Sequence, residues 1–502
     1  MLADHSLTFV YSLAIILILT SIYNYLTSPL RAIPGPLFAR FSRLWYLFNI
    51  SSGHFEKSTA SLHTRHGKIV RLSPNQYSIN DPTAFQTIYK SRPEFRKSDF
   101  YAAWETPGKL NIFTQRDVAT HARDRKKFHA AYTMSTMTTY KKYVDDCVSI
   151  LCQRLEERMG QEVDMAWWLQ CFAFDVIGEI SYSKRFGFLD KCEDQEGLIE
   201  NVGRTTRYSL VMGVVPEWHG FCFGVLVLLG RMGVGKGAGK KFLRDFTLKS
   251  LEEKQEALEK GREEDGDDKP KDFMTKFIEQ NHSDPSTFTL DDAINGVMGN
   301  INAGSDTTGV ALSAIVYYLV STPSALQKLR DELSQHQVSD PITFKEAQSL
   351  PYLQAVIKEA MRLHPSIAVQ LPRVVPEGGT TIAGQFFPAG TVVGVNPYVL
   401  HRDKDVYGED AETFRPERWL KSDTDPETLA RMESSWCPFG AGSRTCIGRN
   451  VSLLEISKLV PELVRRFEFE MGGELERDGL RTRGEFFLHV ENLRLRVWRL
   501  RG

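Results

Sequence analysis

The pattern of hydrophobic and polar positions divides the chain into an uncharged N-terminal segment and a long body of mixed spacing. Residues 6–30 include no charged side chain, and the apolar middle, Leu7–Leu26, is long enough as a helix to cross about 30 Å of hydrocarbon. Asp4 precedes this run without any Lys or Arg, and no small-residue cleavage site follows it, which favours a retained transmembrane helix over a cleaved signal peptide. Residues 1–30 are therefore predicted to be a membrane anchor that crosses at about residues 7–26.

The residues after this segment indicate its orientation. Arg31, Arg40 and Arg43 follow the apolar run. Because Lys and Arg collect on the cytoplasmic side of a membrane span, the rest of the chain is predicted to lie in the cytoplasm. Pro34 and Pro36 fix their backbone φ angles and cannot continue a helix, so they are expected to form a stiff elbow.

Helical spacing dominates the body, with short strand-like runs near its start. Residues 68–72 and 76–79 lie between turn residues and predict two strands, whereas most of residues 117–258 repeat their apolar positions at helical spacing. We therefore predict a mainly α fold with small β-sheets, of the α+β class, and the length allows either one large domain or two or three smaller ones.

Composition and charge narrow the functions that this body could have. Lys and Arg total 62 against 63 for Asp and Glu, so the net charge of -1 provides no basic field of the kind that nucleic-acid binding needs. Seven cysteines are scattered without a CxxC pair, which indicates neither a disulfide framework nor a zinc site. This cysteine usage fits a reducing compartment, in agreement with the predicted cytoplasmic orientation.

One cysteine near the C-terminus lies in unusual surroundings. A lone cysteine is most often a small buried hydrophobe. Cys446, however, follows Gly440 and Arg444 and precedes Gly448, so the backbone can approach a flat ligand closely and a permanent positive charge is at hand. The next residues have helical spacing, which would place the sulfur at a helix N-terminus, where the thiolate is favoured. The sequence thus predicts an ionised sulfur ready to bind a metal.

A second unusual stretch lies inside a predicted core helix. Residues 289–292 have the spacing of a helix start, and apolar and small residues continue to Ser321 before Pro323. The centre contains Gly304, Asp306 and Thr307, which weaken a helix or compete for its hydrogen bonds. We expect a groove there that can hold oxygen and water; a packing glycine beside a polar patch is the alternative.

The window FGAGSRTCIG resembles the haem-binding signature F-x-x-G-x-R-x-C-x-G of the cytochrome P450 family. By this resemblance, Cys446 is the axial ligand of the iron in haem b, Phe439 shields the sulfur, and Arg444 binds a haem propionate, with Gly440 and Gly448 completing the loop. The resemblance also implies that residues 31–502 form a single catalytic domain with the cytochrome P450 fold.

The polar stretch of the core helix fits the same family. Residues 303–308 look like its acid–alcohol motif, in which Thr307 orients protons at bound oxygen and Asp306 supplies them from solvent. Glu359 and Arg362 share a helix face, and by resemblance Arg418 completes a structural Glu-Arg-Arg network behind the thiolate loop. An ordinary surface ion pair is the alternative for Glu359 and Arg362.

Further side chains are assigned to the cofactor and the substrate by resemblance alone. The haem propionates are expected to meet His121, Arg125 and Arg373. The substrate pocket is expected to be lined by Phe100, Tyr101, Ala303, Ile367, Val369 and Phe486. Simple packing is the alternative for these hydrophobic loop residues.

The resemblance implies an oxidoreductase, a monooxygenase that hydroxylates, epoxidises or demethylates a small lipophilic substrate with O2. Electrons would come from NADPH through a separate NADPH-cytochrome P450 reductase. Residues 97–101 and 172–180 look like fungal microsomal members related to pisatin demethylase, which suggests secondary metabolite biosynthesis or detoxification. We expect a monomer held by one membrane pass in the endoplasmic reticulum, with no nucleic-acid partner.

Two other functions remain open at this point. The first is an isomerase or dehydratase of the same fold that works without a reductase; the Asp306-Thr307 pair argues against it. The second is a non-catalytic haem-binding sensor, which would bind ligand without turnover.

Overall fold

The computed structural model describes residues 2–90, 94–105, 110–232, 238–260 and 270–500. The helices of the first half are α1 (Leu2–Thr27), α2 (Leu44–Ser51), α3 (Phe55–His66), α4 (Pro82–Lys90), α5 (Val118–His129), α6 (Met134–Thr139), α7 (Lys141–Glu156), α8 (Met165–Tyr182), α9 (Phe188–Lys191), α10 (Leu198–Met212), α11 (His219–Arg231) and α12 (Ala238–Glu259). Those of the second half are α13 (Phe273–Ser283), α14 (Leu290–Ser321), α15 (Pro323–Gln335), α16 (Phe344–Ser349), α17 (Pro351–Leu363), α18 (Pro397–Leu400), α19 (Lys404–Tyr407), α20 (Pro426–Ser435), α21 (Arg449–Arg466) and α22 (Gly473–Asp478).

Short 3-10 helices and strands complete the fold. The 3-10 helices are η1 (Phe38–Arg40), η2 (Asp99–Trp104), η3 (Ala130–Tyr132), η4 (Gln195–Gly197), η5 (Pro216–Trp218), η6 (Pro416–Trp419) and η7 (Gly442–Arg444). The strands are β1 (Ile69–Ser73), β2 (Gln76–Ile79), β3 (Arg96–Lys97), β4 (Glu162–Asp164), β5 (Arg373–Val374), β6 (Thr380–Ile382), β7 (Gln385–Phe387), β8 (Val392–Gly394), β9 (Phe467–Met471), β10 (Thr482–Gly484), β11 (Leu488–Val490) and β12 (Arg494–Arg499).

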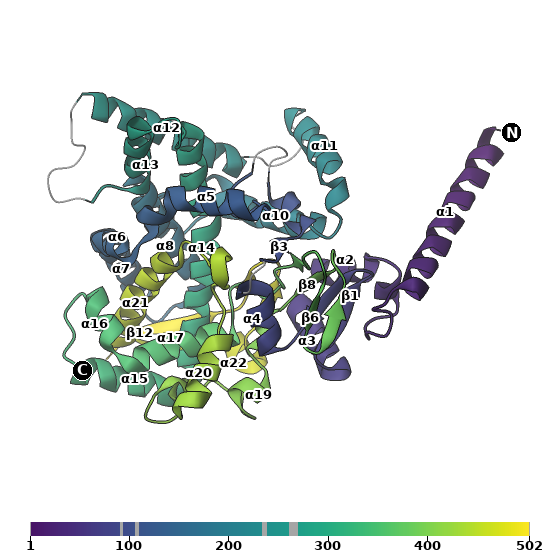
Figure 1. Cartoon of the computed structure of the whole chain (residues 1–502). Coiled ribbons are helices and arrows are strands. Elements are labelled where there is room, and N and C mark those ends of the chain that lie inside the picture. Colours follow the sequence, from purple (N-terminus) through teal and green to yellow (C-terminus); the bar gives the residue numbers. More distant parts are fainter. Residues whose placement is uncertain (1, 91–93, 106–109, 233–237, 261–269, 501–502) are drawn as a thin grey trace.

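Helix α14 runs through the middle of the body, and α8 packs along it (Figure 1). Its N-terminus is fixed by a capping box, in which Thr289 accepts from the backbone N–H of Asp292 and Asp292 accepts from that of Thr289. Helix α8 is apolar on most sides and almost fully buried, as expected for a helix in the centre of a large core. The main core joins these two helices to α7, α17 and α21.

In the part of the chain that the structure describes, four small sheets lie around this helical core. The largest has the strand order β1-β2-β8-β5-β3, in which β2 and β8 are parallel and the other neighbours are antiparallel. Strand β12 pairs with β4 and β9, β10 pairs with β11, and β6 pairs with β7. In the largest sheet Lys97 of β3 lies directly opposite Arg373 of β5, which brings two positive charges together.

Most of the local predictions are confirmed. Both predicted strands are present, as β1 and β2, and the helix that starts at the Thr289 cap ends at Ser321. A helix also begins soon after Cys446, at Arg449. The mainly α fold with small sheets is therefore confirmed.

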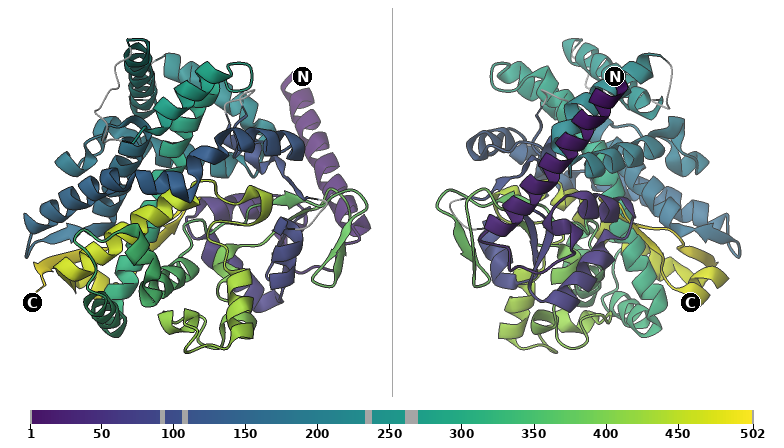
Figure 2. Two further views of the ribbon diagram at one scale, coloured as in Figure 1. Left: turned by 60° about the vertical axis from the view of Figure 1, so that its left-hand side comes forward. Right: turned by 90° about the vertical axis from the view of Figure 1, so that its right-hand side faces the viewer.

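The N-terminal segment projects from the body as helix α1 (Figures 1 and 2). The side chains of residues 7–10, 13 and 14, within the predicted transmembrane helix at residues 7–26, lie outside those that the structure describes. Among the described residues no single helix is both long and apolar enough to cross a membrane, and Ile15–Thr27 of α1 is a shorter apolar stretch. Two helix pairs, each bent at a short break, have the length and composition of a membrane span only when the two helices are taken together. They are Gln195–Met212 with Pro216–Gly230 and Leu290–Ser321 with Pro323–Gln335.

Candidate active site

The loop before α21 is closed by its own backbone. The Cys446 N–H donates to the Phe439 carbonyl over 2.9 Å, so the chain folds back on itself between these residues. Gly440 and Gly442 have φ angles of 69° and 64°, a region that favours glycine. A Cβ atom at Gly442 would also lie 2.1 Å from the Tyr89 carbonyl oxygen, so no larger residue fits there. The glycines thus form a tight loop that presents Cys446.

Cys446 is the one cysteine classed as exposed among the seven, whereas Cys437 nine residues upstream is buried. Burial by the surrounding protein nevertheless raises the pKa of the Cys446 thiol, although the N–H groups of Gly448 and Arg449 and the charge of Arg125 lower it. The thiol therefore faces a space inside the protein. The ionised, metal-ready state of this sulfur stays a prediction: burial opposes ionisation, and a bound metal ion would favour it.

Helix α14, which packs against α21, has accessible positions near its centre. Within the continuous helix α14, Ala303 is exposed and Thr307 is half-buried, whereas Ser305 and Asp306 are buried. The Thr307 hydroxyl donates to the Ala303 carbonyl over 2.8 Å. On the next residue the Thr308 hydroxyl lies 2.6 Å from that of Ser452 on α21. This buried contact ties α14 to the helix that follows Cys446.

Basic side chains from four separate segments lie close together. Lys97, His121, Arg125, Arg373 and Arg444 are close enough to shift one another's pKa values. Burial lowers the pKa of Lys97 well below its usual value, and the three arginines lower it further. Burial and the same charges lower the pKa of His121 to about 3, so this imidazole is neutral.

The cluster has more positive charge than its protein partners neutralise. Arg444 Nε lies 2.9 Å from Glu94 Oε1, and Arg444 Nη1 donates to the Gln115 carbonyl. Arg444 Nη2 is buried without a hydrogen-bond partner among the described residues. Buried cations are costly unless they are paired. Residues 97, 125, 373 and 444 therefore fit a ligand with carboxylate groups, such as the two propionates of haem.

Two members of this cluster extend or modify the sequence predictions. Lys97 was missed, because a single lysine in a polar run has no sequence signal; its ammonium lies 4.5 Å from the centre of the Tyr101 ring and 4.6 Å from that of Phe113. Arg373 donates to the Tyr101 hydroxyl over 2.8 Å. Tyr101, predicted to line the substrate pocket, is thus also bound to the cationic cluster.

The predicted Glu-Arg-Arg network is present and fully buried. Glu359 accepts from Arg362 Nε and Nη2 over 2.8 Å each and from Arg418 Nε over 2.9 Å. The Trp419 indole N–H and the Arg415 backbone N–H also donate to Glu359. Burial alone would raise the pKa of Glu359, but the hydrogen bonds and charges of these arginines hold it below its usual value. The alternative of a surface ion pair is wrong.

A buried histidine joins this network to the cysteine loop. His401 Nδ1 lies 3.0 Å from the Arg362 carbonyl oxygen, and the Cys437 backbone N–H donates to His401 Nε2 over 2.9 Å. Burial lowers the pKa of His401 to about 3, so the ring is neutral and can donate at one nitrogen while it accepts at the other. His401 was also missed, because its partners are 36 and 39 residues away.

The predicted substrate residues gather in one apolar cluster. Phe100, Tyr101, Val369 and Phe486 are buried together, and Ile367 packs against them. The Trp104 and Phe486 ring centres are only 4.2 Å apart. Ala303, from α14, is outside this cluster and exposed.

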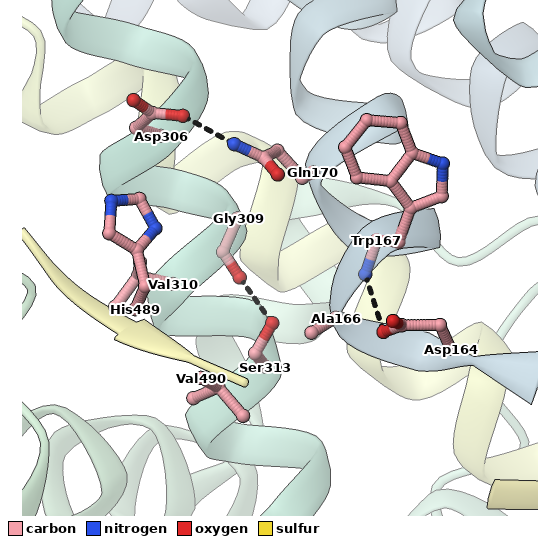
Figure 3. A pocket seen from close by; sticks show the side chains of 10 residues that line it. All are labelled: Asp164, Ala166, Trp167, Gln170, Asp306, Gly309, Val310, Ser313, His489 and Val490. Atoms are coloured by element: carbon pink, nitrogen blue, oxygen red, sulfur yellow. Dashed lines mark hydrogen bonds between the residues drawn. The ribbon is translucent and has the colours of Figure 1, made fainter. Parts of the chain in front are cut away.

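On a different face of α14, Asp306 lines a cavity of about 110 Å³ (Figure 3). Gln170 Nε2 of α8 donates to Asp306 Oδ1 over 2.6 Å, and His489 of β11 lines the same cavity. Gly309 permits this approach, because a Cβ atom there would lie 3.1 Å from the Gln170 Cα atom. Burial raises the pKa of Asp306, although His489 and Gln170 lower it. Gln170 and His489 were missed, since they are far from Asp306 in the sequence.

Comparison with known proteins agrees with the geometry. The family described as Cytochrome P450 matches residues 34–496, and the chain therefore belongs to the cytochrome P450 family. Such a protein is a monooxygenase, and the family implies a haem-iron cofactor.

Several fungal relatives are similar over most of their length. Pisatin demethylase of Fusarium vanettenii is 38% identical over 455 residues, which cover 90% of this chain and 85% of that protein. A cytochrome P450 monooxygenase of Aspergillus terreus is 37% identical over 87% of this chain and 89% of its own length. Cytochrome P450 monooxygenase pkfB of Emericella nidulans is 34% identical, with 93% and 91% covered.

Proposed function

We propose that the chain is a haem-thiolate monooxygenase that oxidises a small lipophilic substrate with O2. The observation that carries this proposal is the accessible Cys446 thiol beside a buried cluster of unneutralised cations. Cys446 would hold the iron of haem b, with Phe439, Gly440 and Gly448 shaping its loop. Lys97, Arg125, Arg373 and Arg444 would pair with the propionates, while neutral His121 would donate a hydrogen bond.

The bound haem would supply the activation of dioxygen, for which an axial thiolate is suited. One oxygen atom enters the substrate and the other leaves as water, so each turnover takes two electrons and two protons besides the substrate. NADPH would provide the electrons through a separate NADPH-cytochrome P450 reductase. Within the chain, Asp306 would hold a proton and Thr307 would orient it toward the reacting oxygen, with Ala303 forming part of the substrate wall.

The aromatic and apolar residues of the candidate pocket support a lipophilic substrate. Phe100, Phe486 and Val369 line it without a charged side chain of their own, so binding would rest on burial of apolar surface. A relative 38% identical is named for demethylation of pisatin. We infer hydroxylation, epoxidation or demethylation of a secondary metabolite, either in its biosynthesis or in detoxification.

We also propose that residues 1–30 anchor the protein in the endoplasmic reticulum, with residues 31–502 as one catalytic domain in the cytoplasm. Helix α1 has 26 residues, about 39 Å at 1.5 Å per residue. Large apolar side chains are exposed in η1, α2 and α11, among them Phe38, Phe48 and Phe221. Arg43 beside α2 and Glu217 beside α11 lie 2.9 Å apart, which joins these segments into one surface that would rest on the membrane.

The test is the absorption spectrum of the reduced protein with carbon monoxide. Wild type should give the red-shifted Soret band of thiolate-bound haem. Cys446→Ser should lose that band, and Cys437→Ala, which removes the buried cysteine nine residues upstream, should keep it. Absence of the band in the wild type would contradict the proposal.

Turnover distinguishes the remaining functions. With a fungal reductase, NADPH and labelled O2, a monooxygenase adds one labelled oxygen to its product. Product formed without NADPH would indicate an isomerase or dehydratase, and ligand binding without any product would indicate a sensor.

A further inference from the structure

The cavity beside Asp306 extends from half-buried residues near the protein surface to the buried face of helix α14. Asp306 and Ser313 are 2% exposed at its inner wall, whereas Asp164 and Trp167 of the outer wall are half-buried. A volume of about 110 Å³ has room for a few water molecules, and polar side chains are present to bind them.

The face of α14 on this cavity differs from the face near Cys446. Asp306, Gly309, Val310 and Ser313 line the cavity at the i, i+3, i+4 and i+7 spacing of one helix face. Thr307, one residue after Asp306, is turned by about 100° around the helix axis. Adjacent residues of one helix therefore connect a cavity that reaches solvent with the side of the helix where chemistry is proposed.

Charged and titratable groups surround Asp306 from each packed element. His489 and Glu485 face it from the β10–β11 hairpin, where Glu485 pairs with Arg483 and Arg207. Asp164 lies on the α8 side and pairs with Arg494 at 3.3 Å, and His364 at the end of α17 is close to His489. His489 is thus the one titratable imidazole that lines the cavity itself among the described residues.

We propose that this cavity is the proton inlet of the enzyme, with His489 and Gln170 as positioning residues for Asp306. This inference rests on the proposed monooxygenase function. A carboxyl group holds one proton, whereas each turnover takes two, so Asp306 must be reprotonated during the cycle. The His489 ring passes a proton through cavity water to Asp306 and recovers one from solvent, and Gln170 holds the carboxyl in place.

Histidine suits this place because one ring nitrogen can give a proton while the other takes one up. Burial raises the pKa of Asp306 and His489 lowers it, so the carboxyl responds to the charge of the imidazole. The proposed inlet therefore contains two groups, His489 and Asp306, that affect each other's protonation and line the same cavity.

The first test measures this link without catalysis. Infrared difference spectra of the resting protein, with Asp306→Asn subtracted, give the C=O band of protonated Asp306 as the pH is varied. In His489→Gln the band should persist to higher pH than in wild type, because the group that lowers the Asp306 pKa is gone. The surface variant His336→Gln is the matched control and should leave the titration unchanged.

The second test measures coupling. With reductase and NADPH, His489→Phe should lower product formed per NADPH by about tenfold, less than the about 100-fold or more of a direct proton donor, because cavity water still reaches Asp306. The missing product should appear as peroxide, and the solvent deuterium isotope effect on product formation should increase. Gln170→Leu should act in the same direction.

The outcomes separate this inference from the proposed function. If His489→Gln and His489→Phe match wild type in the Asp306 titration, coupling and isotope effect, the inlet is refuted while the monooxygenase stands. If wild type itself lacks the carbon monoxide band, the proposed function fails first.

Discussion

The region behind Cys446 and the region that would hold the substrate are built by different forces. Glu359 accepts five hydrogen bonds from Arg362, Arg415, Arg418 and Trp419, all with defined directions. The cluster around Phe486 has mainly ring and aliphatic contacts, which are non-directional. The first arrangement admits few residue types at each position, whereas the second requires only an apolar surface of suitable shape.

This difference has a functional meaning. A ligand that is the same in every turnover needs a rigid support, and directional networks provide one. A pocket that distinguishes substrates can change by exchange of one apolar residue for another at small cost in stability. We therefore expect substitutions behind Cys446 to affect folding and cofactor retention, and substitutions near Phe486 to affect which substrate binds.

The largest effect is expected at Glu359. Glu359→Ala leaves the buried guanidinium groups of Arg362 and Arg418 without their carboxylate, and breaking a buried pair in this way costs about 3–5 kcal/mol. The urea midpoint of unfolding should fall accordingly. Glu359→Gln keeps the shape and part of the hydrogen bonding, so it should lie between wild type and Glu359→Ala. Equal stability of all three would contradict the role of the network.

A smaller effect is expected at His401. His401→Phe leaves the Cys437 N–H and the Arg362 carbonyl unpaired, at a cost of about 1–3 kcal/mol near pH 7. The folded pKa of His401 is about 3 against an ordinary value of 6.5, so wild type gains full stability from this residue above pH 6.5 and loses it as the pH falls.

The sign of the pH dependence makes this prediction sharper. Below pH 6.5, protonation of the unfolded chain costs wild type about 1.4 kcal/mol per pH unit through His401, and the phenylalanine variant has no such loss. The difference between the two proteins in urea unfolding should shrink to zero within about two pH units. A constant difference from pH 7 to pH 5 would show that His401 is not buried in neutral form.

A substitution at Phe486 should lower stability less than one at His401, and it should change ligand binding. Phe486→Leu keeps the position apolar and loses ring contacts, at about 1 kcal/mol. Phe174→Leu in α8, whose ring lies 5.1 Å from that of Phe188, is the matched control with a similar loss. Dissociation constants for a panel of lipophilic ligands should change in Phe486→Leu and not in Phe174→Leu; equal effects would place Phe486 in the core alone.

The same difference explains how far the sequence could predict the molecule. Local spacing predicted helix α14 and its Thr289 cap. A specific run of residue types predicted the Cys446 loop. Ionisation of Cys446 stays a prediction, and the burial that opposes it could not be read from the sequence, because burial is a property of the assembled fold. Lys97 and His489 could not be found, since their partners come from distant segments and single residues of these types have no signal.

The smallest stability effect is expected on α14, where the two sides of one helix can be compared directly. Thr307 and Ser305 both donate a side-chain hydrogen bond to the carbonyl four residues before, at 2.8 and 2.7 Å, but Thr307 is half-buried and Ser305 fully buried. Removal of either hydroxyl frees a carbonyl that already accepts a hydrogen bond within the helix, so the free energy of unfolding should change by only about 0.5 kcal/mol in Thr307→Ala.

Thr307→Ala should nevertheless release peroxide in place of product. Ser305→Ala should stay coupled, and Thr307→Ser should restore coupling. Normal coupling in Thr307→Ala would remove this hydroxyl from proton delivery and leave Asp306 to act through water alone.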